Sequence, residues 1–164
     1  MMWFDKHDDR AVFADCRAEE LDVSHCTSNP GRKVVAPDVL HDFRSMDFPD
    51  EHFHHVVFDP PHVRGISMKS VTGFSYGSLD KETWESDLAA GFKECFRVLK
   101  PHGTLIFKWN EVDIPLKDVL ALTPEKPLYG HRSGKKANTH WVAFIKSVDD
   151  SSDATDTGST SPGI

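Results

Sequence analysis

The sequence has few of the features that mark secreted or membrane-spanning proteins. It contains three cysteines, Cys16, Cys26 and Cys95, and an odd number at wide spacing argues against a disulfide framework. Its apolar runs are short, as in Val56-Val57-Phe58, so no segment is long enough to span a bilayer. No charged start followed by an apolar stretch and a small-residue cleavage site opens the chain. We therefore predict a cytoplasmic protein.

The size and composition indicate one folded domain followed by a tail. The 164 residues, of which 38% are hydrophobic, suffice for a single buried core. The composition changes after Lys146, because residues 147–164 are mostly Ser, Thr, Asp and Gly. Such a segment has too little apolar surface to offset the entropy lost on ordering. We therefore predict a folded domain over residues 1–146 and a disordered acidic tail over residues 147–164.

The formal net charge of −7 does not decide whether the partner is a nucleic acid. The tail holds four Asp and no Lys or Arg, which leaves 22 acids against 19 bases in the folded domain. The most basic stretch, residues 129–136, reads YGHRSGKK. We predict that Arg132, Lys135 and Lys136 contact phosphates, with a plain solvated loop as the alternative.

Short β-rich runs alternate with helical stretches, which is typical of an α/β sheet with crossover helices. We predict strands at residues 11–15, within 33–42, and at 54–58, 104–109 and 139–146. Apolar residues at three- and four-residue spacing predict a helix over residues 79–100. We expect Asp80 as its N-cap and Pro101-His102-Gly103 as its end.

Two further segments connect these elements. Residues 63–78 are rich in Gly and Ser, and we predict a long loop there. A short helix is expected over residues 114–122, with Pro115 in its first turn.

Three acids stand at the ends of predicted strands. Asp15 ends the first, Asp42 follows the second, and Asp59 ends the third. In an open α/β sheet, ligands bind at the carboxyl ends of the strands. We therefore expect these carboxylates to line one binding site.

The segment Asp59-Pro60-Pro61-His62 is suited to holding an amino group. An amide or exocyclic nitrogen is a poor nucleophile, because its lone pair is delocalised. The carboxylate of Asp59 can accept one of its protons and the Pro60 carbonyl the other, since Pro61 has no N–H and holds the backbone out of any ladder. The ring of His62 would lie beside the target plane.

These residues resemble the Asp/Asn-Pro-Pro-aromatic motif of the class I amino-methyltransferases, which act on adenine N6, cytosine N4 or glutamine N5. His62 departs from the usual Tyr, Phe or Trp. The segment ECFRVLKPHGTLIF, residues 94–107, is similar to the helix–Gly–strand unit that follows the motif. Residues 1–146 also resemble a compact bacterial and phage group of methyltransferase-like proteins, which share MMWFDK, FDPPH, FKWNE and a closing THW…F.K strand.

The resemblance implies a Rossmann-like sheet that is mostly parallel with a final antiparallel strand, and S-adenosyl-L-methionine as cofactor. It implies that Asp42 and the neighbouring Phe43 hold the adenine of this donor, and that Asp15 holds its ribose. In class I methyltransferases a first strand and a Gly-rich loop support the methionine part of the donor. No such segment precedes residue 11, so we expect this chain to bind the donor weakly and an N-terminally extended chain to bind it well.

Other interpretations remain open from the sequence. The chain could be a binding protein with a methyltransferase fold and no catalysis, or a protein glutamine N-methyltransferase. SGKK lacks the glycine spacing of a P-loop, which argues against an NTPase. The adjacent His54 and His55 point to opposite faces of a strand, and we predict no metal site. Asn110 and Glu111 follow a strand and are candidates for contacts with the acceptor.

Overall fold

The computed structural model describes residues 3–22, 31–133 and 138–148. Its elements in chain order are β1 (Ala14–Asp15), β2 (Glu19–Asp22), β3 (Arg32–Val35), β4 (Val39–Leu40), β5 (Phe53–Phe58), α1 (Val71–Tyr76), α2 (Trp84–Val98), β6 (Leu99–Asn110), α3 (Leu116–Leu120), β7 (Tyr129–Ser133) and β8 (Thr139–Ile145). No helix within these ranges is long and apolar enough to cross a membrane.

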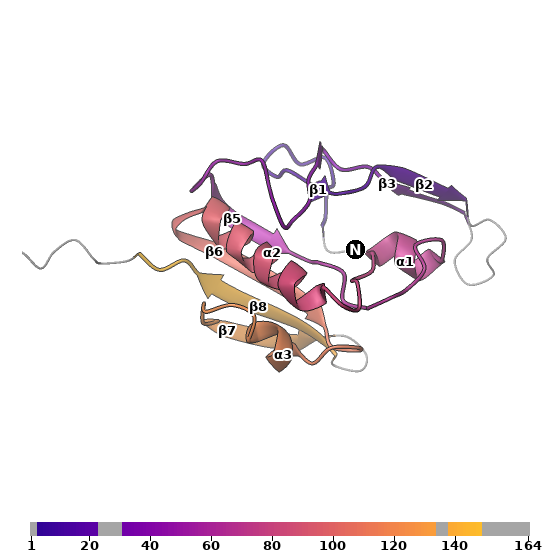
Figure 1. The fold of residues 1–164 in the computed structure, drawn as a ribbon. Helices are drawn as coiled ribbons and strands as arrows, with labels where there is room; N and C mark the ends of the chain where they lie inside the picture. The colour runs from indigo at the N-terminus through magenta and orange to yellow at the C-terminus, as the bar shows by residue number, and fades with distance from the viewer. Residues whose placement is uncertain (1–2, 23–30, 134–137, 149–164) are drawn as a thin grey trace, which may run out of the picture.

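The main sheet has four strands in the order β5-β6-β8-β7 (Figure 1). β5 and β6 are parallel, and β8 is antiparallel to both of its neighbours, β6 and β7. Three of the four strands therefore run in one direction and only the last strand in the chain runs against them. The predicted α/β sheet, mostly parallel with a final antiparallel strand, is confirmed.

Helix α2 makes the crossover between the parallel strands β5 and β6. Its buried residues recur on one face and pack on the sheet with β6 and β8; they include Leu88, Phe92, Cys95 and Phe96. Gly91 allows a close approach, because a Cβ there would lie 2.7 Å from the rings of both Phe43 and Phe58. The strand predicted at residues 104–109 lies within β6, which stands between β5 and β8.

The predicted ends of the long helix are wrong at both termini. The carboxylate of Asp80 accepts hydrogen bonds from the amides of Glu82 and Thr83 in a turn that precedes α2, and the helix begins only at Trp84. At the other end β6 starts at Leu99 and runs through Pro101, His102 and Gly103. Pairing with β5 outweighs the local stop signal, and an irregularity in the register absorbs the proline.

Two segments expected to be loops contain regular structure. Helix α1 lies inside the predicted loop at residues 63–78 and begins at Ser70, whose hydroxyl accepts a hydrogen bond from the Gly73 amide at 3.0 Å. Residues 129–133 form β7, an edge strand paired with β8, instead of a solvated loop. Pro115 is the N-cap of α3 and stands just outside its first turn.

The described residues before β5, namely 3–22 and 31–52, form what we call the N-terminal layer. It contains the parallel pair β1–β4 and the antiparallel pair β2–β3, and neither pair joins the main sheet. None of its described residues is buried, whereas the core begins at Phe58. Within the described residues, β5 pairs only with β6, so its outer edge faces the space between the main sheet and the N-terminal layer.

Candidate functional site

A cleft of about 760 Å³ lies between the N-terminal layer and the main sheet. Every residue that the sequence analysis predicted for catalysis or donor binding lines it: Asp15, Asp42, Phe43, Asp59, Pro60, Pro61 and His62. These residues come from the ends of β1, β4 and β5, as expected for an α/β sheet. The structure thus brings three separate segments of sequence to one site.

The Pro-Pro turn that follows β5 is held from two sides. Pro60 is buried, and Pro61 packs against the end of α1. Gly77, which ends α1 with a φ of 75°, makes this contact possible, because a Cβ there would lie 2.7 Å from Cγ of Pro61. Asp59 is consequently placed at a fixed turn between the strand and α1. Among the described residues, no hydrogen bond to the Pro60 carbonyl is recorded, which agrees with its predicted freedom to accept one.

A smaller pocket of about 350 Å³ adjoins the turn. Its lining combines one acid, one base, two aromatic rings and two neutral polar side chains: Asp59, Lys108, His62, Tyr76, Asn110 and Thr139. The amide of Asn110 lies 3.3 Å from the Thr139 hydroxyl, which joins the end of β6 to the start of β8. The lining of the pocket is therefore both polar and aromatic.

His62 is half-buried between two other rings. Its centroid lies 5.9 Å from that of Tyr76 and 6.4 Å from that of Trp109, and both contacts are edge-on. Burial lowers the pKa of His62, against the opposing influence of Asp59. The ring is therefore neutral at neutral pH and presents an uncharged flat surface.

Lys108 is the direct partner of Asp59. The register pairs Phe58 with Phe107, so the next residue of each parallel strand emerges at the same end of the sheet. The Lys108 ammonium donates to Oδ2 of Asp59 at 2.6 Å, and it also lies 5.8 Å from the ring centroid of Trp141. Both side chains of the ion pair are about one-third exposed or less, at 26% for Lys108 and 34% for Asp59.

Asp15 is held by the arginine two residues later. The Arg17 guanidinium donates to both carboxylate oxygens of Asp15 at 2.9 Å, and the Arg17 amide adds a third bond at 3.0 Å. The same guanidinium reaches across the cleft to the Phe74 carbonyl of α1 at 2.8 Å. Arg17 therefore orients the carboxylate of Asp15 and links the N-terminal layer to α1.

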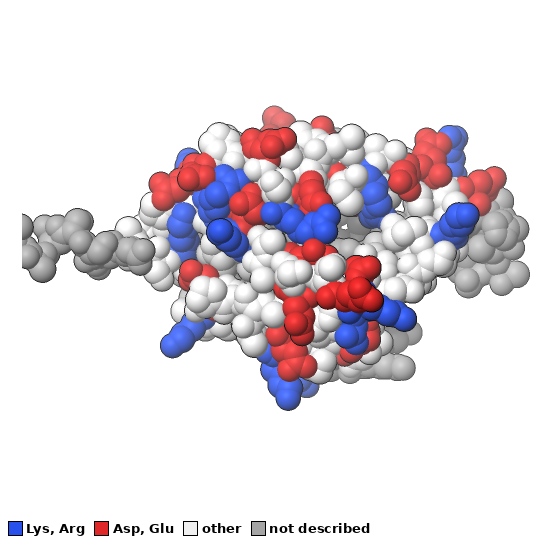
Figure 2. All heavy atoms as spheres, in the orientation of Figure 1, with Lys and Arg blue, Asp and Glu red and all other residues white. Residues whose placement is uncertain are grey.

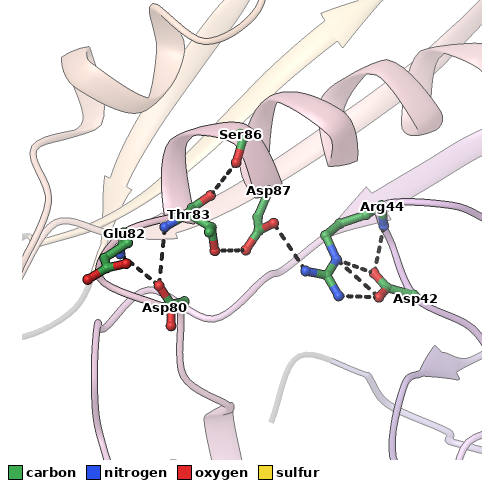
Figure 3. Close-up of polar contacts among 7 residues, drawn as sticks. All are labelled: Asp42, Arg44, Asp80, Glu82, Thr83, Ser86 and Asp87. Atoms are coloured by element: carbon green, nitrogen blue, oxygen red, sulfur yellow. Dashed lines mark hydrogen bonds and ion pairs between the residues drawn. The ribbon is translucent and has the colours of Figure 1, made fainter.

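Asp42 repeats this arrangement with Arg44. The Arg44 amide donates to Asp42 Oδ1 at 2.9 Å, and its guanidinium spans Asp42 and Asp87 of α2 (Figure 3). These hydrogen bonds lower the pKa of Asp42 and keep it ionised at neutral pH. The adjacent Phe43 turns its ring toward the core, 5.4 Å from that of Phe58.

The predicted phosphate contacts are only partly covered by the structure. Arg132 lies on β7 with its guanidinium 3.5 Å from Glu111, which also lies 2.9 Å from Nε2 of His140. Glu111 thus has partners within the protein, and the His140 contact lowers its pKa. Lys135 and Lys136 lie outside the described residues. On the face shown in Figure 2, acidic and basic side chains are interspersed.

Four residues of the site were not found from the sequence. They are the two cleft arginines Arg17 and Arg44, the aromatic Tyr76 and the hydroxyl residue Thr139. The sequence analysis did not assign Lys108 to the site either. The repeated Asp-x-Arg spacing at residues 15–17 and 42–44 was a usable signal, whereas the contact of Tyr76 depends on where α1 packs.

No family model and no curated protein matches the chain. Solved structures that it resembles include a protein from Pyrococcus horikoshii, with 16% identity over 66% of this chain and 58% of that one and a TM-score of 0.47. Another is a Thermus thermophilus protein, named as a candidate DNA modification methylase and solved with S-adenosyl-L-methionine, with 16% identity over 74% of this chain and 56% of that one and a TM-score of 0.44. A Leishmania major SAM-dependent methyltransferase gives 13% identity over 66% and 44%, with a TM-score of 0.41.

The chain spans about half the length of these structures. At such TM-scores we infer function from the residues of the site and not from the likeness.

Proposed function

We propose that this chain forms the catalytic frame of a methyltransferase that moves a methyl group from S-adenosyl-L-methionine to an amino or amide nitrogen. The observation that carries the proposal is the cleft itself. The Asp59-Pro60-Pro61-His62 turn, suited to an amino group, opens into the same space as Asp15 and the Asp42–Phe43 pair.

The cleft fits the donor in size and chemistry. Its volume of about 760 Å³ lies in the range of small-molecule sites. The carboxylate of Asp15, oriented by Arg17, suits the vicinal hydroxyls of a ribose. Asp42 and Phe43 offer an acceptor and an apolar surface for an adenine ring. These three residues would therefore hold the adenosine portion.

The acceptor side follows from the Pro-Pro turn. When bound, S-adenosyl-L-methionine would supply an electrophilic methyl group. Transfer of this group would form a carbon–nitrogen bond and return the carbon–sulfur bonding pair to sulfur, and it would leave one surplus proton on the acceptor nitrogen. Asp59 and the Pro60 carbonyl accept hydrogen bonds from the two N–H groups of the target nitrogen and so direct its lone pair. Asp59 then takes the surplus proton. His62 flanks the acceptor plane. Alignment supplies most of the rate in such a displacement.

An adenine N6 or cytosine N4 is the acceptor we favour over a glutamine side chain. The rings of His62 and Tyr76 line the pocket beside Asp59 and supply aromatic surface for a base. Contacts from the Arg132 region to phosphates would serve the same acceptor class.

The test is methyl transfer from labelled donor to adenine- and cytosine-containing oligonucleotides and to a glutamine peptide. Asp59→Ala should lower transfer by about 100-fold or more while the protein stays folded by circular dichroism. Asp47→Ala is the matched control, because its side chain is 95% exposed, and its transfer should be unchanged. Equal activity of both variants would overturn the role of Asp59.

Calorimetry with the donor separates catalysis from binding alone. Donor binding without transfer to any acceptor would favour the non-catalytic binding protein instead.

A further inference from the structure

Lys108 occupies the position in the pocket where it can meet the acceptor together with Asp59. Its ammonium contacts Asp59 Oδ2 and lines the 350 Å³ pocket, while no hydrogen bond to Asp59 Oδ1 is recorded among the described residues. An ammonium group has three N–H donors, and Asp59 takes only one of them. The pair therefore presents an acceptor, Oδ1, and a donor, Nζ, side by side.

This acceptor and donor together match a ligand in which an amino group stands next to a hydrogen-bond acceptor. In adenine N6 lies next to the ring acceptor N1, and in cytosine N4 lies next to N3, so both bases offer an amino donor and a ring acceptor in one plane. An aliphatic amine or a hydroxyl group lacks the second atom. The carboxamide of a glutamine side chain also carries an acceptor beside its amino group, and it is disfavoured because the aromatic lining of His62 and Tyr76 offers stacking area that a heterocycle fills better.

We propose that Lys108 is a specificity-determining residue that donates a hydrogen bond to the ring nitrogen next to the target amine, which restricts the acceptor to an aminopyrimidine-type edge. This inference rests on the proposed function. The ammonium also fixes the rotamer of Asp59 through Oδ2 and so directs Oδ1 to the amino group. Lys108 belongs to the main sheet rather than to a loop, which keeps its backbone in place.

The test compares acceptors that differ by one ring atom. Oligonucleotides carry adenine or 1-deazaadenine, and cytosine or 3-deazacytosine, at the methylated position. With the unmodified protein, loss of the ring nitrogen should lower kcat/KM about tenfold, as expected for one hydrogen bond to a charged group. With Lys108→Met the same replacement should change kcat/KM less than about twofold. The loss of kcat/KM on removing the ring nitrogen is compared between the unmodified protein and Lys108→Met. This comparison cancels the difference in intrinsic nucleophilicity between the bases.

Two further variants make the result specific. Lys108→Arg keeps a charged donor, so removal of the ring nitrogen should still lower kcat/KM by most of the factor seen with the unmodified protein. Lys100→Met removes a lysine from the same strand that contacts His54 and not the pocket, and should behave as the unmodified protein. If Lys108→Met is too slow to assay, the same comparison is made on oligonucleotide binding by fluorescence anisotropy.

The outcomes separate the two claims. If removal of the ring nitrogen lowers kcat/KM equally in the unmodified protein and in Lys108→Met, the role of Lys108 is overturned and the proposed function stands. Preferential transfer to the glutamine peptide would overturn the assignment of a base. Absence of transfer from the unmodified protein to any acceptor would overturn the proposed function, and the role of Lys108 with it.

Discussion

The main sheet and the N-terminal layer are stabilised in different ways. The sheet and α2 enclose a core in which Phe92, Phe107, Trp109 and others are almost fully buried. The N-terminal layer has no buried residue among those described. Hydrogen bonds to α1 and α2 attach it, and its partly buried Phe43 and Met46 pack against the core. The residues that we propose for the acceptor, Asp59 and Lys108, belong to the first region, and those that we propose for the donor, Asp15 and Asp42, to the second. The proposed acceptor residues thus stand on the buried core, and the proposed donor residues on a layer that is held by polar links and by the packing of Phe43 and Met46.

The largest difference between the regions should appear on removing one phenylalanine from each. Phe107→Ala deletes a side chain with no solvent exposure and should lower the free energy of unfolding by about 3–5 kcal/mol. Phe4→Ala deletes a fully exposed ring and should change it by less than about 0.5 kcal/mol. Urea denaturation followed by circular dichroism measures both. A cost of about 2 kcal/mol or more for Phe4→Ala would contradict the full exposure of this ring.

A smaller loss of unfolding free energy is expected on replacing Arg97, the arginine that attaches residues 46–50 to α2. The Arg97 guanidinium donates to the carbonyls of Met46 and Phe48, each at 2.8 Å, and to Asp50 and Glu94. Arg97→Met should cost about 1–2 kcal/mol and speed hydrogen exchange in residues 41–50 more than in β6.

Arg10→Met is the matched control for this change. Within the part of the chain that the structure describes, the Arg10 guanidinium pairs with Asp8 alone, and the side chain is 85% exposed. It should leave exchange in residues 41–50 unchanged. Uniform acceleration across β6 in Arg97→Met would contradict a local attachment.

The polar links should also make stability fall in acid. Hydrogen bonds from Arg97 and from the Met46 amide lower the pKa of Glu94, and Arg44 lowers that of Asp42. A carboxyl group with a lower pKa in the folded state stabilises the fold above its unfolded pKa, near 4.3 for Glu, and this contribution is lost as the pH falls through the folded value. The unfolding free energy should therefore drop below about pH 4.5.

Glu94→Gln tests the origin of that drop. It should be less stable than the unmodified protein at pH 7 and should lose less stability between pH 5 and pH 3. Glu85→Gln, at an exposed position in the first turn of α2, should keep the original slope. Parallel pH profiles for all three proteins would rule out Glu94 as a source of the acid sensitivity.

The smallest effect is expected from removing residues 147–164. Lys146 remains, and its ammonium bond to the Leu99 carbonyl and its backbone bonds to His102 and Gly103 are kept. The sequence of the segment predicts no docking on the core, so the unfolding free energy should change by less than about 0.5 kcal/mol. A drop in the melting temperature of several degrees would show that the segment is bound.

The sequence alone determined those features that depend on local pattern. The alternation of short strands and an amphipathic helix predicted the α/β sheet, and two consecutive prolines after an apolar run placed the turn at Asp59. Local stop signals were less informative, because Asp80 and Pro101 were read as the ends of a helix, whereas pairing between strands decided where α2 stops.

Only the tertiary structure decided which side chains share the site. Lys108 meets Asp59 across 49 residues of sequence because of the β5–β6 register, and Arg17 meets the Phe74 carbonyl across 57 because α1 packs beside the N-terminal layer. Periodicity describes which face a residue takes on its own element, and it carries no information about the register between elements. The residues that would distinguish one acceptor from another are therefore visible only in the folded chain.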